Sequence, residues 1–371
     1  MSEPAVPPDD LRPYWVGFNR VPGIGVLRLR RLIDAFGDAR AAWEAPAGQL
    51  AASGLGGGTL QALLELRRKL DLGAEMRRLE ELGVRVVTID DPSYPQRLRE
   101  IYGAPPLLFV RGALPPTAAP VLSVVGTRQA TAYGRAVTEQ LVGELARGGV
   151  WIVSGFARGI DTQAHRAALD AGGRTVAVFA CGLDTIYPPE NRDLARRILE
   201  SGALLSELPL GARPEARNFP ARNRIVSGLS AATLVVEAGE RSGALITAEF
   251  ALAQGRDVLA VPGPITSPRS AGTNRLIQDG ARLVQSAEEV RSELGLRSAA
   301  QTETQLRLAE LMPLDPDEQA VVARLAAEPL LTDDLAHALG RPIQELQATL
   351  TMLELKGHVR QVAGLNYLIH T

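Results

Sequence analysis

Six short apolar runs, separated by helical segments, are the feature that most restricts the fold of this 371-residue chain. The runs are rich in β-branched residues and too short for helices, which is typical of strands that are buried on both faces. Strands alternating with helices form a parallel sheet covered on both sides. We therefore predict an α/β, Rossmann-like parallel sheet over residues 111–297, with strands at Val121–Val125, Val150–Val153, Thr175–Ala180, Ala203–Ser206, Thr233–Val236 and Val258–Val261.

A helical unit is expected before this core, in residues 1–110. It ends in two strand-like runs, Arg85–Ile89 and Leu107–Val110, with proline-containing turns between them. Near its start, Val21-Pro22-Gly23-Ile24-Gly25 is followed by an amphipathic helix. A Gly-x-Gly turn of this kind predicts a SAM-like helix-hairpin-helix domain. The segment 114–120 is a proline-rich linker to the core.

A winged-helix domain is expected after the core, in residues 315–371, beyond a polar linker at 298–314. The sequence predicts three helices followed by a β-hairpin around Gly364, which is the order of a winged helix. The predicted elements are Asp317–Ala327, Thr332–Leu339, a helix from Arg341-Pro342 to Lys356, and strands at Val359–Gln361 and Tyr367–Ile369.

Composition excludes several classes of protein. The formal net charge is −2, so nucleic-acid binding would have to depend on local basic patches. Cys181 is the only cysteine, which excludes a disulfide framework and thiolate zinc clusters and predicts a buried core thiol. The acidic, proline-rich segment 1–10 does not resemble a signal peptide, and no apolar run approaches the ~18 residues of a membrane span. We expect a cytoplasmic protein that does not insert into a membrane.

Three predicted strand-to-helix turns carry small polar residues. They are Gly126-Thr127-Arg128, Ser154-Gly155 and Ser242-Gly243, the last in the turn that starts at Glu237. In a parallel sheet these turns share one edge, where glycine permits close approach of a ligand and helix N-termini attract anions. The set predicts a phosphate-binding rim, although any βα unit needs a tight turn.

A basic loop with an aromatic residue narrows the choice of ligand. Four arginines surround Phe219 and Asn223, and only Glu215 opposes them; the four are Arg213, Arg217, Arg222 and Arg224. Arginine pairs with phosphate, and an aromatic ring can stack on a base for ~1–3 kcal/mol. Single-stranded nucleic acid fits this combination better than a mononucleotide does. The alternative is a solvated loop with Phe219 packed in the core.

Signs of catalysis are weak. The dinucleotide fingerprint after the first strand, the Walker A sequence and the G-x-S-x-G elbow do not occur. Asp161 and His165 could share a helix face as a catalytic or metal pair, but a helix cap and a packed histidine explain them more simply. We expect no enzyme activity, no cofactor and no metal site.

The flanking units offer weaker nucleic-acid contacts. Gly23, Gly25 and Arg28 of the hairpin could hold a phosphate without reading sequence, or the hairpin could serve as a protein contact or a structural pair. The third helix of the C-terminal unit carries Glu345 and Glu354. Phosphate contact needs cations, so a protein-contact or regulatory role fits that unit better.

These residues resemble one family, the bacterial DNA-processing protein family DprA/Smf, from about Tyr94 to Val284. The resemblance is carried by Tyr94-Pro95, Val125-Gly126-Thr127-Arg128, Tyr133-Gly134, Ser154-Gly155-Phe156-Ala157-Arg158-Gly159-Ile160-Asp161, Ala164-His165, Gly182-Leu183-Asp184, Tyr187-Pro188, Ser206-Glu207, Phe219-Pro220-Ala221-Arg222-Asn223-Arg224-Ile225, Glu237, Ser242-Gly243-Ala244-Leu245-Ile246-Thr247-Ala248, Val261-Pro262-Gly263 and Gly272-Thr273-Asn274.

The resemblance implies a homodimer that binds single-stranded DNA, loads the RecA recombinase onto it and relieves inhibition by the protein SSB during natural transformation. By motif, it places DNA contacts at Arg128, Phe219 and the Arg222-Asn223-Arg224 segment, and the surrounding turns add Arg158. Pro189 and Glu190 stand where many members have a basic residue, and Arg213 and Arg217 are the cations that could compensate. Binding of double-stranded DNA is left open.

Two alternatives remain. The chain also resembles Rossmann-like phosphoribohydrolases at the Ser-Gly turn and at Glu237, although Gly239-Glu240-Arg241-Ser242-Gly243 replaces their Pro-Gly-Gly-x-Gly-Thr signature. A scaffold for other recombination proteins, with no DNA binding of its own, is the third possibility.

Overall fold

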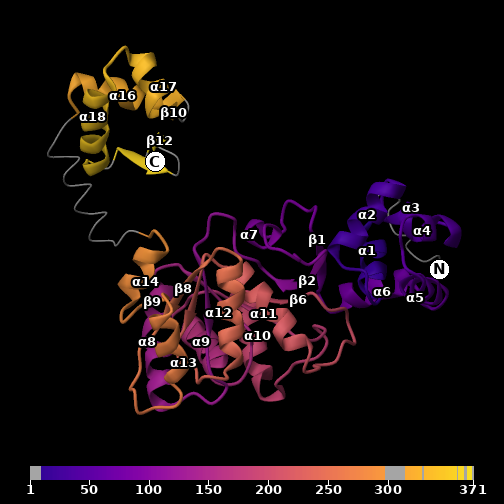
Figure 1. Cartoon of the computed structure of the whole chain (residues 1–371). Helices are drawn as coiled ribbons and strands as arrows, with labels where there is room; N and C mark the ends of the chain where they lie inside the picture. Colours follow the sequence, from indigo (N-terminus) through magenta and orange to yellow (C-terminus); the bar gives the residue numbers. More distant parts are fainter. Residues whose placement is uncertain (1–9, 297–313, 328–329, 357, 363–365, 370–371) are drawn as a thin grey trace. The chain divides into compact units, whose positions relative to one another are not determined.

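A computed structural model describes residues 10–296, 314–327, 330–356, 358–362 and 366–369. The chain divides into two compact units, Met1–Leu294 and Gly295–Thr371 (Figure 1). Apart from Leu314, the predicted linker 298–314 lies outside the described residues, as does Gly364 of the predicted hairpin.

A nine-stranded sheet forms the centre of the first unit, in the order β1-β2-β6-β5-β4-β3-β7-β8-β9. All six predicted core strands are present, and the Rossmann-like fold is confirmed. The strands are β1 Arg85–Thr88, β2 Leu107–Gly112, β3 Val121–Val125, β4 Trp151–Ser154, β5 Thr175–Val178, β6 Ala203–Ser206, β7 Ala232–Val235, β8 Asp257–Ala260 and β9 Arg282–Leu283.

Parallel pairing extends from β6 to β9, as the apolar character of these strands predicts. The strands predicted for the N-terminal unit, β1 and β2, join the same sheet as an antiparallel extension. Phe109 of β2 pairs with Ser206 of β6, and Arg85 of β1 pairs with Val110 of β2. The predicted boundary between residues 110 and 111 therefore falls inside β2.

Helices cover both faces of the sheet. They are α8 Ala132–Arg147, α9 Ile160–Asp170, the short 3-10 helix η1 Pro189–Asn191, α10 Arg192–Ser201, α11 Asn218–Gly228, α12 Gly243–Ala253, α13 Ala271–Gln278 and α14 Ala287–Glu293. The crossovers run from β3 toward β6 in one direction and from β7 toward β9 in the other. Because such crossovers are right-handed, α8, α9 and α10 lie on one face of the sheet and α12 lies on the other. The direction in which successive strands are added reverses between β3 and β7.

Helices precede β1: α1 Arg12–Asn19, α2 Val26–Phe36, α3 Ala39–Glu44, α4 Ala47–Ala52, α5 Gly57–Lys69 and α6 Leu72–Glu81. The short helix α7 Gln96–Arg99 lies between β1 and β2. The predicted hairpin joins α1 to α2, with Gly23 at a φ of 87° and Gly25 as the N-cap of α2. A positive φ favours glycine because it has no Cβ. Phe18 packs edge-on against Trp43, with ring centroids 5.1 Å apart, and anchors this pair to α3.

The C-terminal unit is a winged helix, as predicted. Its elements are α16 Pro316–Ala327, β10 Leu330–Leu331, α17 Thr332–Leu339, α18 Ile343–Leu355, β11 Val359–Val362 and β12 Asn366–Ile369. The three strands form an antiparallel sheet in the order β10-β12-β11. Val321, Leu335 and Leu350 are buried in its core.

Candidate nucleic-acid interface

A pocket of about 860 Å³ lies at the carboxyl ends of β3, β4 and β7. The predicted turns contribute Gly126-Thr127-Arg128, Gly155 and Ser242-Gly243 to its lining, so the three turns do share one edge of the sheet. This edge adjoins the reversal between β3 and β7, which is where open α/β sheets bind ligands.

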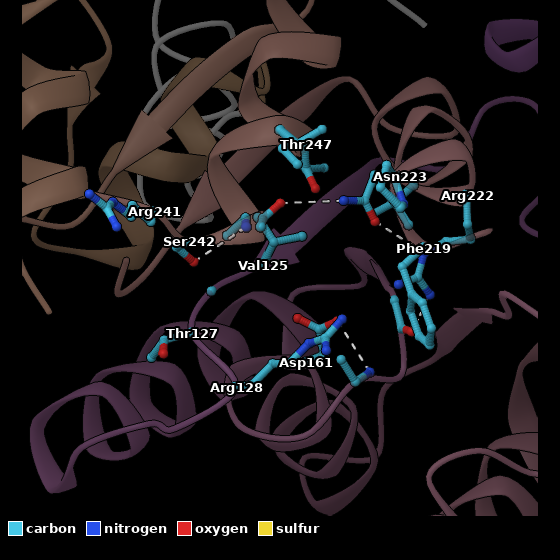
Figure 2. A pocket seen from close by; sticks show the side chains of 18 of the residues that line it. Val125, Thr127, Arg128, Asp161, Phe219, Arg222, Asn223, Arg241, Ser242 and Thr247 are labelled. Atoms are coloured by element: carbon cyan, nitrogen blue, oxygen red, sulfur yellow. Dashed lines mark hydrogen bonds between the residues drawn. The ribbon is translucent and has the colours of Figure 1, made fainter. Parts of the chain in front are cut away.

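Arg128 and Phe219 come together at this pocket although 91 positions separate them in sequence. The Arg128 guanidinium carbon lies 5.0 Å from the centroid of the Phe219 ring, within the range of a cation–π contact. Tyr187 adds a third side chain, with its ring centroid 5.9 Å from that of Phe219. Figure 2 shows Arg128 and Phe219 reaching the same hollow from different elements.

The position of Phe219 follows from its place in α11. It is the second residue of the helix and is only half-buried, whereas Ile225 and Val226 farther along are buried against the sheet. The alternative expectation, that Phe219 packs in the core, is therefore wrong. The ring offers a face on which an unpaired base can stack.

Arg222, one of the predicted DNA contacts, lies beneath the pocket and is only 4% exposed. Its Nη1 donates to the carbonyl oxygens of Gly155 and Val178. Burial lowers the pKa of Arg222 to about 10, and the neighbouring Asp161 carboxylate opposes that shift. A Cβ on Gly155 would come within 2.5 Å of the guanidinium, so the glycine makes room for it. Arg222 thus supports the pocket floor.

Asp161 lines the same floor and belongs to the first turn of α9. It is not the helix cap that the sequence predicted, because Gly159 is the N-cap residue. Its Oδ2 accepts the Ala157 N–H across 3.3 Å. Burial raises the pKa of Asp161 to about 6, and the charges of Arg222 and Arg128 act in the opposite direction.

Two further predicted residues point elsewhere. Ser154 is fully buried, and its hydroxyl donates to the Val124 carbonyl across 2.6 Å, so it joins neighbouring strands. Arg224 forms an ion pair with Glu207, and neither side chain belongs to the pocket lining. A DNA contact at Ser154 or Arg224 would require these bonds to be broken.

The remaining predicted cations lie at or near the rim. Arg213 is exposed, Arg217 forms a 2.8 Å ion pair with Glu215, and Arg158 forms an ion pair with Glu190. All these ion pairs are solvent-exposed, so they are worth little and phosphate can replace them. Glu190 nevertheless reduces the positive charge beside Arg158.

Polar groups complete the wall on the α12 side. Asn223 donates from Nδ2 to the Gly243 carbonyl across 3.4 Å, and Ser242 caps α12 by accepting the Ala244 N–H across 3.3 Å. The Thr127 hydroxyl accepts the Gln129 N–H across 3.2 Å. These contacts fix the turns whose backbone faces the pocket.

The pocket residues that the sequence did not identify as contacts include three with polar or charged side chains, Arg241, Arg269 and Gln129. Arg241 is exposed and lies toward the end of the pocket away from Phe219 (Figure 2). Arg269 reaches over from the segment after β8 and donates to the backbone carbonyl and the side chain of Gln129. Arg241 could have been predicted, because it lies in the turn that starts at Glu237 and contains Ser242-Gly243. No local sequence pattern identifies Arg269 as a pocket residue.

The candidate catalytic groups are engaged in packing. His165 is fully buried, bonds Thr175 Oγ1 at 2.7 Å, and has its pKa lowered to about 3, first by burial and then by Arg222. Cys181 is buried as predicted, and burial raises its pKa to about 11. Among the described residues, no group of three or more His, Cys, Asp or Glu side chains could hold a metal ion.

Glu237, on which the phosphoribohydrolase alternative depends, is a buried residue outside the pocket lining. Its two carboxylate oxygens accept the backbone N–H and the hydroxyl of Thr131, at 2.9 and 2.8 Å. Thr131 is the N-cap of α8, so Glu237 positions the start of that helix.

The hairpin residues Gly23 and Gly25 are exposed, and Arg28 folds back to donate to the Gly23 carbonyl across 2.6 Å. None of the three lines the pocket, and a phosphate contact there stays a prediction. Among the described residues, no helix has the length and apolar character to cross a membrane.

The fold and the pocket define a class: a Rossmann-like protein with a cationic, aromatic-bearing pocket at the strand reversal, followed by a winged helix. Residues 85–295 match the sequence profile of DNA recombination-mediator protein A, and residues 306–364 match that of the DprA winged helix domain. The chain belongs to the DNA recombination-mediator protein A family, also called DprA or Smf.

Relatives match over most of this chain. Protein Smf of Synechocystis is 34% identical, covering 95% of this chain and 98% of its own. Protein Smf of Escherichia coli is 40% identical, covering 82% of both. The crystal structure of DprA from Streptococcus pneumoniae superposes with a TM-score of 0.67 at 37% identity, over 76% of this chain and 97% of that one.

A structure of DNA processing protein A from Helicobacter pylori superposes with a TM-score of 0.51 at 30% identity. The match covers 57% of this chain and 95% of that chain, and that structure gives insights into the single-stranded DNA binding mode of the Helicobacter pylori protein.

Proposed function

We propose that this protein binds single-stranded DNA in the pocket at the carboxyl edge of the sheet, as a recombination mediator and not as an enzyme. The observation that carries the proposal is the juxtaposition of Arg128 and Phe219, 5.0 Å apart at the rim. Arg128 pairs with a phosphate of the sugar-phosphate chain, and Phe219 stacks on an unpaired base. A duplex has no unpaired base to offer.

The distribution of positive charge along the pocket supports the proposal that a single DNA strand runs across it. Arg128 and Arg241 are exposed, and no described carboxylate forms a salt bridge with either of them. They bring positive charge to two parts of one hollow, as the phosphates of successive nucleotides require. Gly243, on which a Cβ would meet no atom within 4 Å, leaves the backbone open to the strand between them.

The family supports the wider role. We infer that the bound strand is handed to a RecA-type recombinase, that SSB is displaced in the process, and that the protein acts as a homodimer in the cytoplasm to protect incoming DNA. The relative from Helicobacter pylori, with its single-stranded DNA binding mode, supports the first step of this sequence.

Fluorescence anisotropy with a labelled oligo-dT tests the binding step. The full chain should bind the oligo-dT, and an unlabelled duplex should compete less well than unlabelled oligo-dT. Arg197→Ala is the matched control, because Arg197 pairs with Asp170 on the exposed surface and is not a pocket residue. Equal binding by Arg128→Ala and Arg197→Ala would contradict the site.

A further inference from the structure

The loop that leads into α11, residues 207–217, connects the pocket with the N-terminal helices. It leaves β6 at Ser206, carries Pro214 and Ala216 of the pocket lining, and ends immediately before Phe219. Its path therefore determines where the aromatic ring stands. A loop of this length without regular structure needs contacts elsewhere to hold one conformation.

Asp184 makes the main contact on the inner side of this loop. The Gly211 N–H donates to both carboxylate oxygens of Asp184, at 3.0 Å each, and Gly211 has a φ of 82°. Beside it, the Gly182 N–H donates to the Ala212 carbonyl across 2.9 Å. The segment after β5, which contains Gly182 and Asp184, therefore holds the middle of the loop by hydrogen bonds to the loop backbone.

Three side chains from the N-terminal helices act on the same two segments. Asn19, the last residue of α1, donates to the Glu207 carbonyl across 3.1 Å. Arg20 donates to the Leu210 carbonyl across 2.9 Å and forms a 2.6 Å ion pair with Glu75. Arg78 of α6 forms a 2.8 Å ion pair with Asp184.

None of these N-terminal side chains lines the pocket. The loop links them to a ligand in the pocket, and for Arg78 that link passes through the Asp184 carboxylate, which accepts the Gly211 N–H. Charge-assisted hydrogen bonds are about twice as strong as neutral ones, so the Arg20–Leu210 bond and the Arg78–Asp184–Gly211 series are both stronger links than the neutral Asn19–Glu207 bond.

We propose that the N-terminal helices act as a brace that positions the Phe219 loop and so sets the affinity for a single strand. Arg78 and Asp184 are positioning residues that do not touch the DNA. The proposal rests on single-strand binding in the pocket, and it assigns the N-terminal unit a role that does not require its hairpin to contact DNA.

The test compares Arg78→Ala, Arg78→Lys and Arg197→Ala in the full chain, with labelled oligo-dT at several salt concentrations. Arg78→Ala should weaken binding by about fivefold or more, the scale of a typical coupling between sites. Because no phosphate contact is lost, the slope of log affinity against log salt should stay unchanged. Arg78→Lys keeps the ion pair and should bind nearly as the unchanged chain does.

Amide hydrogen exchange supplies a readout without DNA. Exchange at residues 209–217 should accelerate in Arg78→Ala and in Asp184→Ala, while the melting temperature of Arg78→Ala stays close to that of the control, since its side chain is half exposed. Unchanged exchange together with unchanged affinity would overturn the brace.

A salt slope reduced by about 0.7 in Arg78→Ala would also overturn it, because Arg78 would then be a phosphate contact. These failures leave single-strand binding intact. If the unchanged chain does not bind the oligo-dT at all, the proposed function is overturned and the brace with it.

Discussion

The sheet-edge pocket and the winged-helix unit are both built on folds that bind nucleic acids, but they use their cations differently. In the pocket, Arg128 and Arg241 are exposed lining residues, and no described carboxylate forms a salt bridge with either of them. In the winged helix, Lys356 is buried in a 2.6 Å ion pair with Glu318, and Arg341 forms an ion pair with Asp317.

Acidic residues strengthen the contrast. The helix α18, which is the third helix of the winged unit, begins with Glu345 in its first turn, and α17 begins with Asp333 and Asp334. A phosphate backbone approaching these helix starts would meet negative charge. A fold therefore does not by itself identify a DNA-binding surface; the available cations do.

The largest effect is expected from Arg128→Ala. The variant lacks a phosphate contact and the cation–π partner of Phe219. We expect this to reduce the free energy of binding oligo-dT by about 2 kcal/mol, which is about 30-fold in affinity. The slope of log affinity against log salt should fall by about 0.7, the value for one single-strand phosphate. Anisotropy titrations at several salt concentrations measure both quantities.

Phe219→Ala should weaken binding by about tenfold, because a stacked base contributes ~1–3 kcal/mol. The salt slope should not change, since the phosphate contacts remain. Phe219→Tyr keeps the ring and is the matched control. A loss of affinity in both variants would mean that the ring has a packing role and does not stack on a base.

Acidification should strengthen binding modestly. Burial raises the pKa of Asp161 to about 6, so the carboxylate is charged above that pH and neutral below it. Removing a negative charge from the pocket floor, next to Arg128 and Arg222, should raise the affinity for DNA about threefold between pH 7 and pH 5.

The variant Asp161→Asn supplies the control for this titration. It should bind with the higher affinity at both pH values, because the amide carries no charge to lose. A pH dependence that persists in Asp161→Asn would show that another group titrates in this range. His165 is not expected to contribute, because its pKa is lowered to about 3.

The smallest effect is expected from Arg341→Ala. Arg341 is paired with Asp317 on the winged helix, and we expect its removal to change the affinity for oligo-dT by less than about twofold. A loss comparable to that of Arg128→Ala would erase the contrast between the two regions and make the winged helix a second DNA-binding surface.

Much of the fold could be predicted because the information is local. Short β-branched runs located β3 to β8, and the residue order after them gave the winged helix. The antiparallel addition of β2 to β6 could not be predicted, since those strands lie more than ninety positions apart and no local pattern encodes their pairing.

The site was only partly predictable for the same reason. The glycine-containing turns predicted the rim of the pocket, and the surrounding arginines identified Phe219 as a candidate contact. However, a sequence pattern does not tell which arginine of a basic loop faces inward. Arg222 turns beneath the floor, Arg224 pairs with Glu207, and Arg269 arrives from a distant segment to join the wall.

Photocrosslinking tests the central claim most directly. An oligo-dT with 5-iodouracil at a single internal position is irradiated in complex with the full chain, and the crosslinked peptide is identified by mass spectrometry. The account predicts attachment at Phe219 or at Tyr187 beside it, and loss of that attachment in Arg128→Ala. Attachment confined to residues 315–371, or to the hairpin around Gly23, would contradict it.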